Sequence, residues 1–130
     1  MKKQIKPTDS ELEILQILWQ HGPLPVRVVN EMLTTKSGEE IGYTTTLKLM
    51  QIMTDKGLVK RNTDQRSHIY EAAAQESETQ QNLLSDFLHA AYRGSTGTLV
   101  MQALGNYNAS KDELKQIKDL ITNLELKSKK

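Results

Sequence analysis

One glycine and two prolines between residues 22 and 25 interrupt two strongly apolar segments near the amino-terminal end of the chain. Residues 8–21 carry a broad apolar stripe before this break, and residues 26–33 carry a second one after it. Glycine permits a left-handed helix end, and proline blocks helix continuation but is tolerated in the first turn of a new helix. The sequence therefore predicts two short helices in close succession, with Pro25 in the first turn of the second.

The first of these helices has a clear start signal. Thr8-Asp9-Ser10-Glu11 is a capping-box pattern, in which the threonine and the glutamate each satisfy a backbone N–H of the other. The helix is expected to end at His21-Gly22-Pro23. Trp19 and the five methionines of the chain are most simply explained as core residues.

A third helix is predicted over residues 43–56, after a polar linker of residues 34–40. Gly57 should end this helix. Apolar or small residues recur along it at helical spacing, so one face should point into the core. The inward residues are expected to be Thr46, Leu49, Met50 and Met53.

Two short strands are predicted next, over residues 58–63 and 67–71, with a turn at Asp64-Gln65-Arg66. Three helices followed by a hairpin with a basic tip is the order of a winged helix-turn-helix domain. The predicted fold class is therefore mainly α with a small β-hairpin, with this winged-helix domain in residues 1–74.

Residues 75–130 have the pattern of helices alone. Helices are predicted over residues 82–92, over residues 98–104 and after a second capping box at Ser110-Lys111-Asp112-Glu113. Three amphipathic helices of about 10–17 residues are marginal on their own, and a second copy of the chain is the simplest partner. We expect a helical dimerisation region, whose contact residues are Leu83, Leu84, Phe87, Leu88, Leu99, Val100, Leu114, Ile117, Leu120, Ile121 and Leu124.

The third helix carries the candidate DNA-reading residues, because the second helix of a helix-turn-helix motif enters the major groove. Its amino-terminal half presents hydroxyl groups and a lysine that can bond to base edges or phosphates. The residues are Tyr43, Thr44, Thr45, Lys48 and Gln51. The simpler alternative is that Thr44 caps the helix and the other threonines only face solvent.

The predicted hairpin adds Lys60, Arg61 and Arg66 to the candidate DNA contacts, because a basic hairpin can straddle the phosphate backbone or enter the minor groove. Acidic residues at positions 55, 64 and 71 leave open an ordinary solvated hairpin. The net charge of +1 does not by itself indicate nucleic acid.

The sequence lacks the residues that other classes of function require. The chain has no cysteine, which excludes disulfides, zinc fingers and thiolate metal sites. His21, His68 and His89 fall in separate elements, and Glu39-Glu40 falls in a polar linker, so neither set indicates a metal or an acid–base pair. We expect no enzyme activity and no cofactor. No apolar run approaches the roughly 20 residues of a membrane span, and residues 1–3 begin no signal peptide, so a cytoplasmic protein is expected.

Several of these residues resemble motifs of the penicillinase-repressor (BlaI/MecI) family. The segment of residues 8–15 with Leu18-Trp19 is similar to the opening of that family. Residues 43–47 with Lys56-Gly57-Leu58-Val59 are similar to its recognition-helix segment, and Leu99-Val100 is similar to a motif of its late helix. The resemblance covers about residues 6–125.

This resemblance implies a homodimeric repressor that binds a pseudo-palindromic operator in double-stranded DNA. It also implies relief of repression by proteolysis in the dimerisation region, triggered by a membrane sensor-protease. The scissile Asn-Phe of the β-lactam repressors maps onto Gln102-Ala103, so this chain differs there. Leu47 and Ile52 stand where relatives carry basic residues, and these losses favour an alternative, a winged-helix protein-interaction adaptor with little or no DNA binding.

Overall fold

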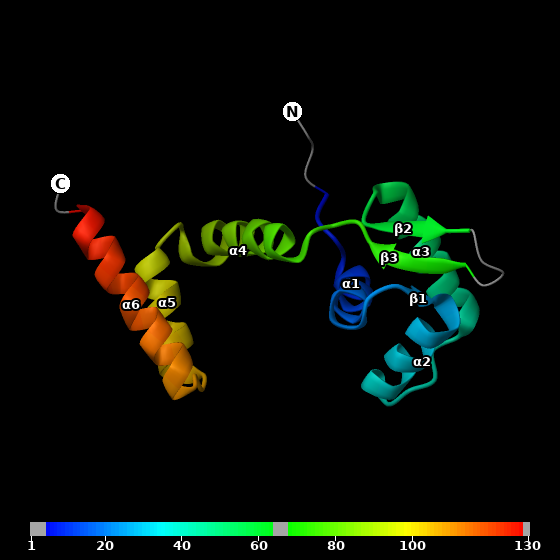
Figure 1. The fold of residues 1–130 in the computed structure, drawn as a ribbon, viewed down its shortest axis with the longest axis horizontal. Helices are drawn as coiled ribbons and strands as arrows, with labels where there is room; N and C mark the ends of the chain where they lie inside the picture. Colours follow the sequence, from blue (N-terminus) through cyan, green and yellow to red (C-terminus); the bar gives the residue numbers. More distant parts are fainter. Residues whose placement is uncertain (1–4, 64–67, 129–130) are drawn as a thin grey trace. The chain divides into compact units, whose positions relative to one another are not determined.

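A computed structural model describes residues 5–63 and 68–128 of the chain. The elements in order are α1 (Asp9–His21), β1 (Leu24–Pro25), α2 (Val26–Ser37), α3 (Tyr43–Lys56), β2 (Val59–Asn62), β3 (Ile69–Ala72), α4 (Glu76–Tyr92), α5 (Thr96–Asn106) and α6 (Lys111–Ser128) (Figure 1). The chain forms two compact units, residues 1–84 and 85–130, so the boundary falls inside α4. The functional division after residue 74 stays a prediction.

The start and the end of α1 are as predicted. The hydroxyl of Thr8 accepts a hydrogen bond from the N–H of Glu11, and Oε1 of Glu11 accepts one from the N–H of Thr8. Gly22 ends the helix with a φ of 83°, and its N–H donates to the carbonyl of Leu18. A side chain at position 22 would be strained in this conformation, which explains the glycine.

The sheet has three strands in the order β1-β3-β2, all antiparallel, so the prediction of a two-stranded hairpin was incomplete. Leu24 pairs with Tyr70 and Pro25 pairs with Ile69. Pro25 therefore lies in an edge strand and precedes α2 as its N-cap, not in the first turn of the helix as predicted. The extended backbone of Pro25 suits an edge strand, where its missing N–H costs no ladder hydrogen bond.

The hairpin strands are displaced slightly from their predicted positions. Strand β2 ends at Asn62 and β3 begins at Ile69, and the predicted turn with Arg66 lies outside the described residues. Leu58, predicted as a strand residue, instead accepts backbone hydrogen bonds from Ala73 and Ala74.

Helix α2 is one turn longer than predicted. Residues 34–37, assigned to a polar linker, continue the helix to Gly38, whose φ is 76°. Residues 35–37 are exposed and carry no apolar side chain, so their sequence gives no periodic signal.

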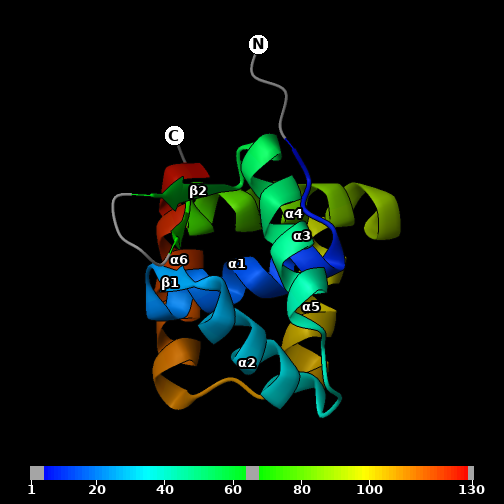
Figure 2. The same cartoon turned by 90° about the vertical axis from the view of Figure 1, so that its right-hand side faces the viewer.

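The core of the first unit lies between α1, α2, α3 and the sheet. Figure 2 shows that α2 and α3 run in different directions, which lets side chains from both meet α1. Trp19 is partly buried against this core, and its Nε1 donates to the carbonyl of Ala74 at 2.9 Å. The buried apolar residues are Ile14, Leu15, Ile17, Leu18, Val26, Val29, Leu33, Met50, Met53, Leu58, Val59 and Tyr70.

Helices α4 and α5 are longer than predicted. Helix α4 begins six residues earlier, at Glu76, and α5 extends from Thr96 to Asn106. The predicted capping box before α6 is present, since Ser110 and Glu113 each accept a hydrogen bond from the other's N–H at 3.0 Å. Neither α5 nor α6 has a buried residue. Among the described residues, no helix is long and apolar enough to span a membrane.

Candidate nucleic-acid interface

Helix α3 has two clearly different faces. Thr46, Met50 and Met53 are fully buried on the inner face, and Leu49 is partly buried beside them, as predicted. The residues predicted to read DNA all lie on the outer face and are exposed. These residues are Tyr43, Thr44, Thr45, Lys48 and Gln51.

The amino-terminal end of α3 leaves Thr44 and Thr45 exposed. Gly42 is the N-cap, and its carbonyl accepts backbone hydrogen bonds from Thr45 and Thr46. Thr44 is already the second residue of the helix, so the alternative that Thr44 is the cap is wrong. The first turn of α3 contains no acidic side chain. The partial positive charge of this helix end is therefore open to a phosphate.

A side chain of α2 holds the start of α3. Nδ2 of Asn30 donates to the carbonyl of Ile41 at 2.8 Å and to the buried hydroxyl of Thr46 at 2.9 Å. The hydroxyl of Thr34 accepts a further hydrogen bond from the N–H of Ile41. These three bonds fix the turn between α2 and α3, and hence the angle at which α3 presents its outer face.

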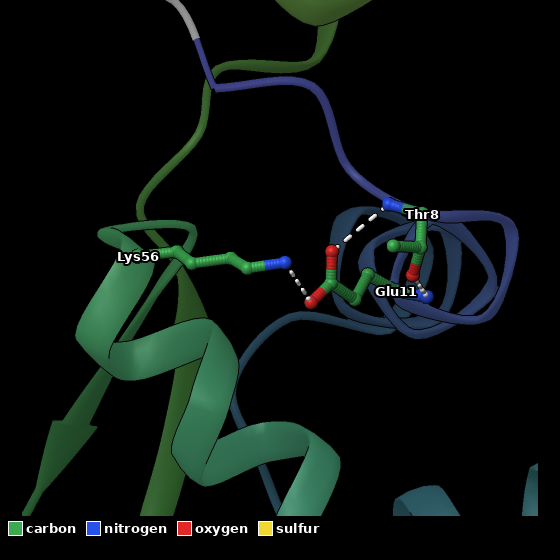
Figure 3. Close-up of polar contacts among 3 residues, drawn as sticks. All are labelled: Thr8, Glu11 and Lys56. Atoms are coloured by element: carbon green, nitrogen blue, oxygen red, sulfur yellow. Dashed lines mark hydrogen bonds and ion pairs between the residues drawn. The ribbon is translucent and has the colours of Figure 1, made fainter.

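The other end of α3 is held by an ion pair with α1 (Figure 3). Nζ of Lys56 lies 2.8 Å from Oε2 of Glu11, whose side chain is 2% exposed. Burial of the carboxyl by itself raises the pKa of Glu11. The hydrogen bonds from Lys56 and Thr8, with the charge of Lys56, outweigh this effect, so the pKa of Glu11 lies below its ordinary value of 4.5.

A groove of about 520 Å³ lies beside α3 and is lined by residues of α2, α3 and the strands of the sheet. Tyr43, Leu47 and Gln51 line it from α3, and Arg61 lines it from β2. We call it the α2–hairpin groove, and its remaining lining residues are Pro25, Val26, Arg27, His68 and Tyr70. The structure thus brings together three of the predicted DNA contacts, which are Tyr43, Gln51 and Arg61.

The remaining predicted DNA contacts of the hairpin are Lys60 and Arg66. Lys60 is exposed but does not line the groove, and it lies directly opposite Glu71 in the β2–β3 register. Arg66 lies outside the described residues. Sequence reasoning missed Arg27, which follows Pro25 by two residues and lies in the first turn of α2.

The side chains of Leu47 and Ile52 lie in different environments. Leu47 is partly buried against the core and lines the α2–hairpin groove, whereas Ile52 is 37% exposed on α3. Leu47 therefore contributes an apolar floor to the groove, and Ile52 presents an apolar side chain to solvent.

Helices α4, α5 and α6 expose most of their apolar side chains. The predicted dimerisation residues Leu84, Phe87, Val100, Leu114, Leu120, Ile121 and Leu124 are exposed, and Leu83, Leu88, Leu99 and Ile117 are partly exposed. Phe87 packs edge-to-face on Tyr92, with ring centroids 5.7 Å apart. Gln102 and Ala103 are exposed in the middle of α5, and Oε1 of Gln102 accepts a hydrogen bond from the hydroxyl of Tyr92 at 2.8 Å.

The polar residues around the groove do not suggest metal chemistry. Within residues 5–63 and 68–128, no three His, Asp or Glu side chains gather as metal ligands would. The arrangement can bind anions and hydrogen-bond acceptors through hydroxyl, amide and guanidinium groups.

Comparison with known proteins gives a consistent family and fold. The model of the family described as penicillinase repressor matches residues 7–123. The penicillinase repressor of Bacillus licheniformis is 24% identical over 122 residues, which is 93% of each chain.

Two solved structures show the same winged-helix fold. The DNA-binding domain of the repressor BlaI has a TM-score of 0.50 and 24% identity, covering 60% of this chain and 93% of that one. The hsRosR-S4 complex has a TM-score of 0.55 and 16% identity, covering 89% of this chain and 87% of that one.

Proposed function

The chain belongs to the penicillinase repressor family, and from this premise we propose that it represses transcription as a homodimer bound to a pseudo-palindromic operator. The observation that carries the proposal is the outer face of α3. Thr44, Thr45 and Lys48 are exposed on a helix whose two ends are fixed to α2 and α1. A rigid helix with exposed hydroxyl and amino groups can read base edges without first paying an ordering cost.

A homodimer is supported by the exposed apolar surface of the second unit. Apolar side chains such as Phe87, Leu120 and Leu124 are each more than half exposed. Burying such side chains contributes about 1.5–3 kcal/mol each, and a second copy offers an identical apolar surface. Two DNA-binding units in one dimer would then bind two half-sites about one helical turn, or 34–36 Å, apart or a multiple of that distance.

Relief by proteolysis is the proposed route of induction. Gln102 and Ala103 are exposed, and α5 has only 11 residues, so the helix can open locally to a protease. A membrane sensor-protease would be the partner that cleaves there, and the repressor would act in the cytoplasm, where the operator is. Neither binding to DNA nor release from it requires a cofactor.

Fluorescence anisotropy with a labelled duplex from the region upstream of the chain's own gene tests the proposal. A repressor should bind this duplex more tightly than a shuffled duplex, and its affinity should fall steeply with salt because binding releases counterions. Equal, weak binding to both duplexes at every salt concentration would favour the adaptor function instead.

Proteolytic relief has its own test. Replacement of Gln102-Ala103 by a Gly-Gly pair should open α5 and raise the rate at which a non-specific protease cleaves there. A Gly-Gly pair in place of Gln80-Gln81 of α4 is the control for disruption of a different helix. DNA-bound protein should be released as α5 is cut. Persistence of the complex after cleavage would contradict the proposed induction.

A further inference from the structure

The α2–hairpin groove contains positive charge but no carboxylate among its lining residues. Arg27 comes from the first turn of α2, and Arg61 comes from β2, so the groove receives a guanidinium group from each of two separate elements. His68 adds a ring with two nitrogen atoms beside β3. Tyr43 and Gln51 of α3 also line the groove and carry a hydroxyl and an amide.

We propose that Arg27 and Arg61 together bind one backbone phosphate of duplex DNA in the α2–hairpin groove. This inference rests on the proposed function, because it places the DNA strand beside α3. It adds a contact from α2 that lies outside the recognition helix and the hairpin tip. Such a contact would set the register of α3 on the duplex without reading sequence.

The geometry of the domain favours a phosphate over a base at this position. In a helix-turn-helix motif the second helix lies in the major groove and the first helix crosses the backbone. Arg27 is on the first helix of the motif, and Tyr43 and Gln51 on the second helix line the same groove. A strand that borders the major groove occupied by α3 therefore passes Arg27.

The present partner of Arg27 is weak enough to be replaced. NH1 of Arg27 lies 3.2 Å from Oε1 of Glu31, one turn further along α2, and the two side chains are 72% and 61% exposed. Exposed pairs of this kind contribute little to stability. A phosphate offers Arg27 a charge-assisted, bidentate partner, which is stronger than the single contact with Glu31.

Leu47 is partly buried and lines the groove, so α3 supplies no charge at this position. Arg27 and Arg61 supply from the sides the cations that Leu47 does not supply from α3.

Salt titrations of DNA binding by full-length variants test the inference. Arg27→Gln should weaken binding to specific and shuffled duplexes alike by about three- to tenfold. It should also reduce the slope of log affinity against log salt, by less than the value of about 0.9 for one whole phosphate contact, because Arg61 still contacts the same phosphate. Arg61→Gln should act in the same way. Since both arginines bind one phosphate, the double variant should lose less than the product of the two single losses.

Two further variants serve as controls within α2. Lys36→Gln removes a cation from the last turn of the same helix, where it lines a different groove beside α1, and should change affinity by less than about twofold. Glu31→Gln removes the competing carboxylate and should strengthen binding. Arg27 is exposed, so its variant should unfold at the wild-type temperature.

The outcomes separate this inference from the proposed function. If the wild type shows no salt-dependent binding, the proposed function fails. If the wild type binds with a steep salt slope and Arg27→Gln matches Lys36→Gln, only the phosphate site is wrong. If inorganic phosphate raises the unfolding temperature of the wild type but not of Arg27→Gln, while both bind DNA equally, the groove binds a free anion and the inference is also wrong.

Discussion

Oε2 of Glu11 in α1 lies 2.8 Å from Nζ of Lys56 in the last turn of α3, although the two residues are 45 positions apart in the chain. The carboxylate is buried, and its other oxygen accepts the N–H of Thr8. One side chain thus caps α1 and fixes the carboxyl end of α3. The position of the proposed recognition helix therefore depends on a buried residue of α1.

Glu11→Gln should lower the free energy of unfolding by about 1–3 kcal/mol, because it removes the charge that pairs with Lys56 and weakens the cap. Urea denaturation followed by circular dichroism measures this loss. Glu13→Gln, at an exposed position of the same helix, is the matched control and should stay near the wild type. Equal stability of the two variants would show that the ion pair does not hold α3.

The stabilisation by Glu11 should depend on pH. Because its pKa in the folded protein lies below the ordinary value of 4.5, the unfolded chain binds a proton more readily. The stability from this group is therefore fully present above about pH 5 and is lost as pH falls through 4.5 and then through the folded pKa. The stability difference between the wild type and Glu11→Gln should shrink over this window, and a difference that stays constant would contradict the assignment.

Asn30→Ala should destabilise the first unit by about 1–3 kcal/mol, because the hydroxyl of Thr46 is buried and loses its donor. Operator affinity should also fall, since the turn before α3 loses its hydrogen bond to Ile41. Thermal unfolding and anisotropy measure the two effects. Thr35→Ala removes an exposed side-chain hydrogen bond of the same helix and should change neither property appreciably.

Thr45→Ala and Lys48→Ala should weaken DNA binding in different ways. Loss of the Thr45 hydroxyl should reduce the preference for the operator over a shuffled duplex, and a base contact of this kind contributes about 1–3 kcal/mol. Loss of the Lys48 charge should weaken binding to both duplexes and reduce the salt slope by about 1. If neither variant differs from the wild type in anisotropy, α3 is not the recognition helix.

The double variant Leu120→Ser with Leu124→Ser should convert the proposed dimer to a monomer, because each leucine is more than half exposed in the single chain and its burial contributes about 1.5–3 kcal/mol. Light scattering after size-exclusion chromatography measures the mass. Gln116→Ser on the same helix is also exposed and should leave the dimer intact. A wild type of monomeric mass at micromolar concentration would contradict the homodimer.

Local signals were sufficient to predict much of the first unit. The capping box at Thr8 and Glu11, the glycine ends of α1 and α3, and the inward position of Met50 and Met53 were all predicted correctly. Each of these features depends on residues within about one or two turns of a helix, so a single sequence contains the information. The exposed face of α3 followed from the same periodicity.

Tertiary structure decided the features that join distant segments. Strand β1 has only two residues and exists because β3 offers a partner for Leu24 and Pro25, which no local pattern could predict. The groove is lined by Arg27 from α2 and Arg61 from β2 beside α3, which are far apart in the chain. By itself the sequence determined where α1 and α3 begin and end and which of their faces are apolar, because these features depend on neighbouring residues. Which polar side chains came together was decided only when burial of those apolar faces packed α1, α2, α3 and the sheet into one core.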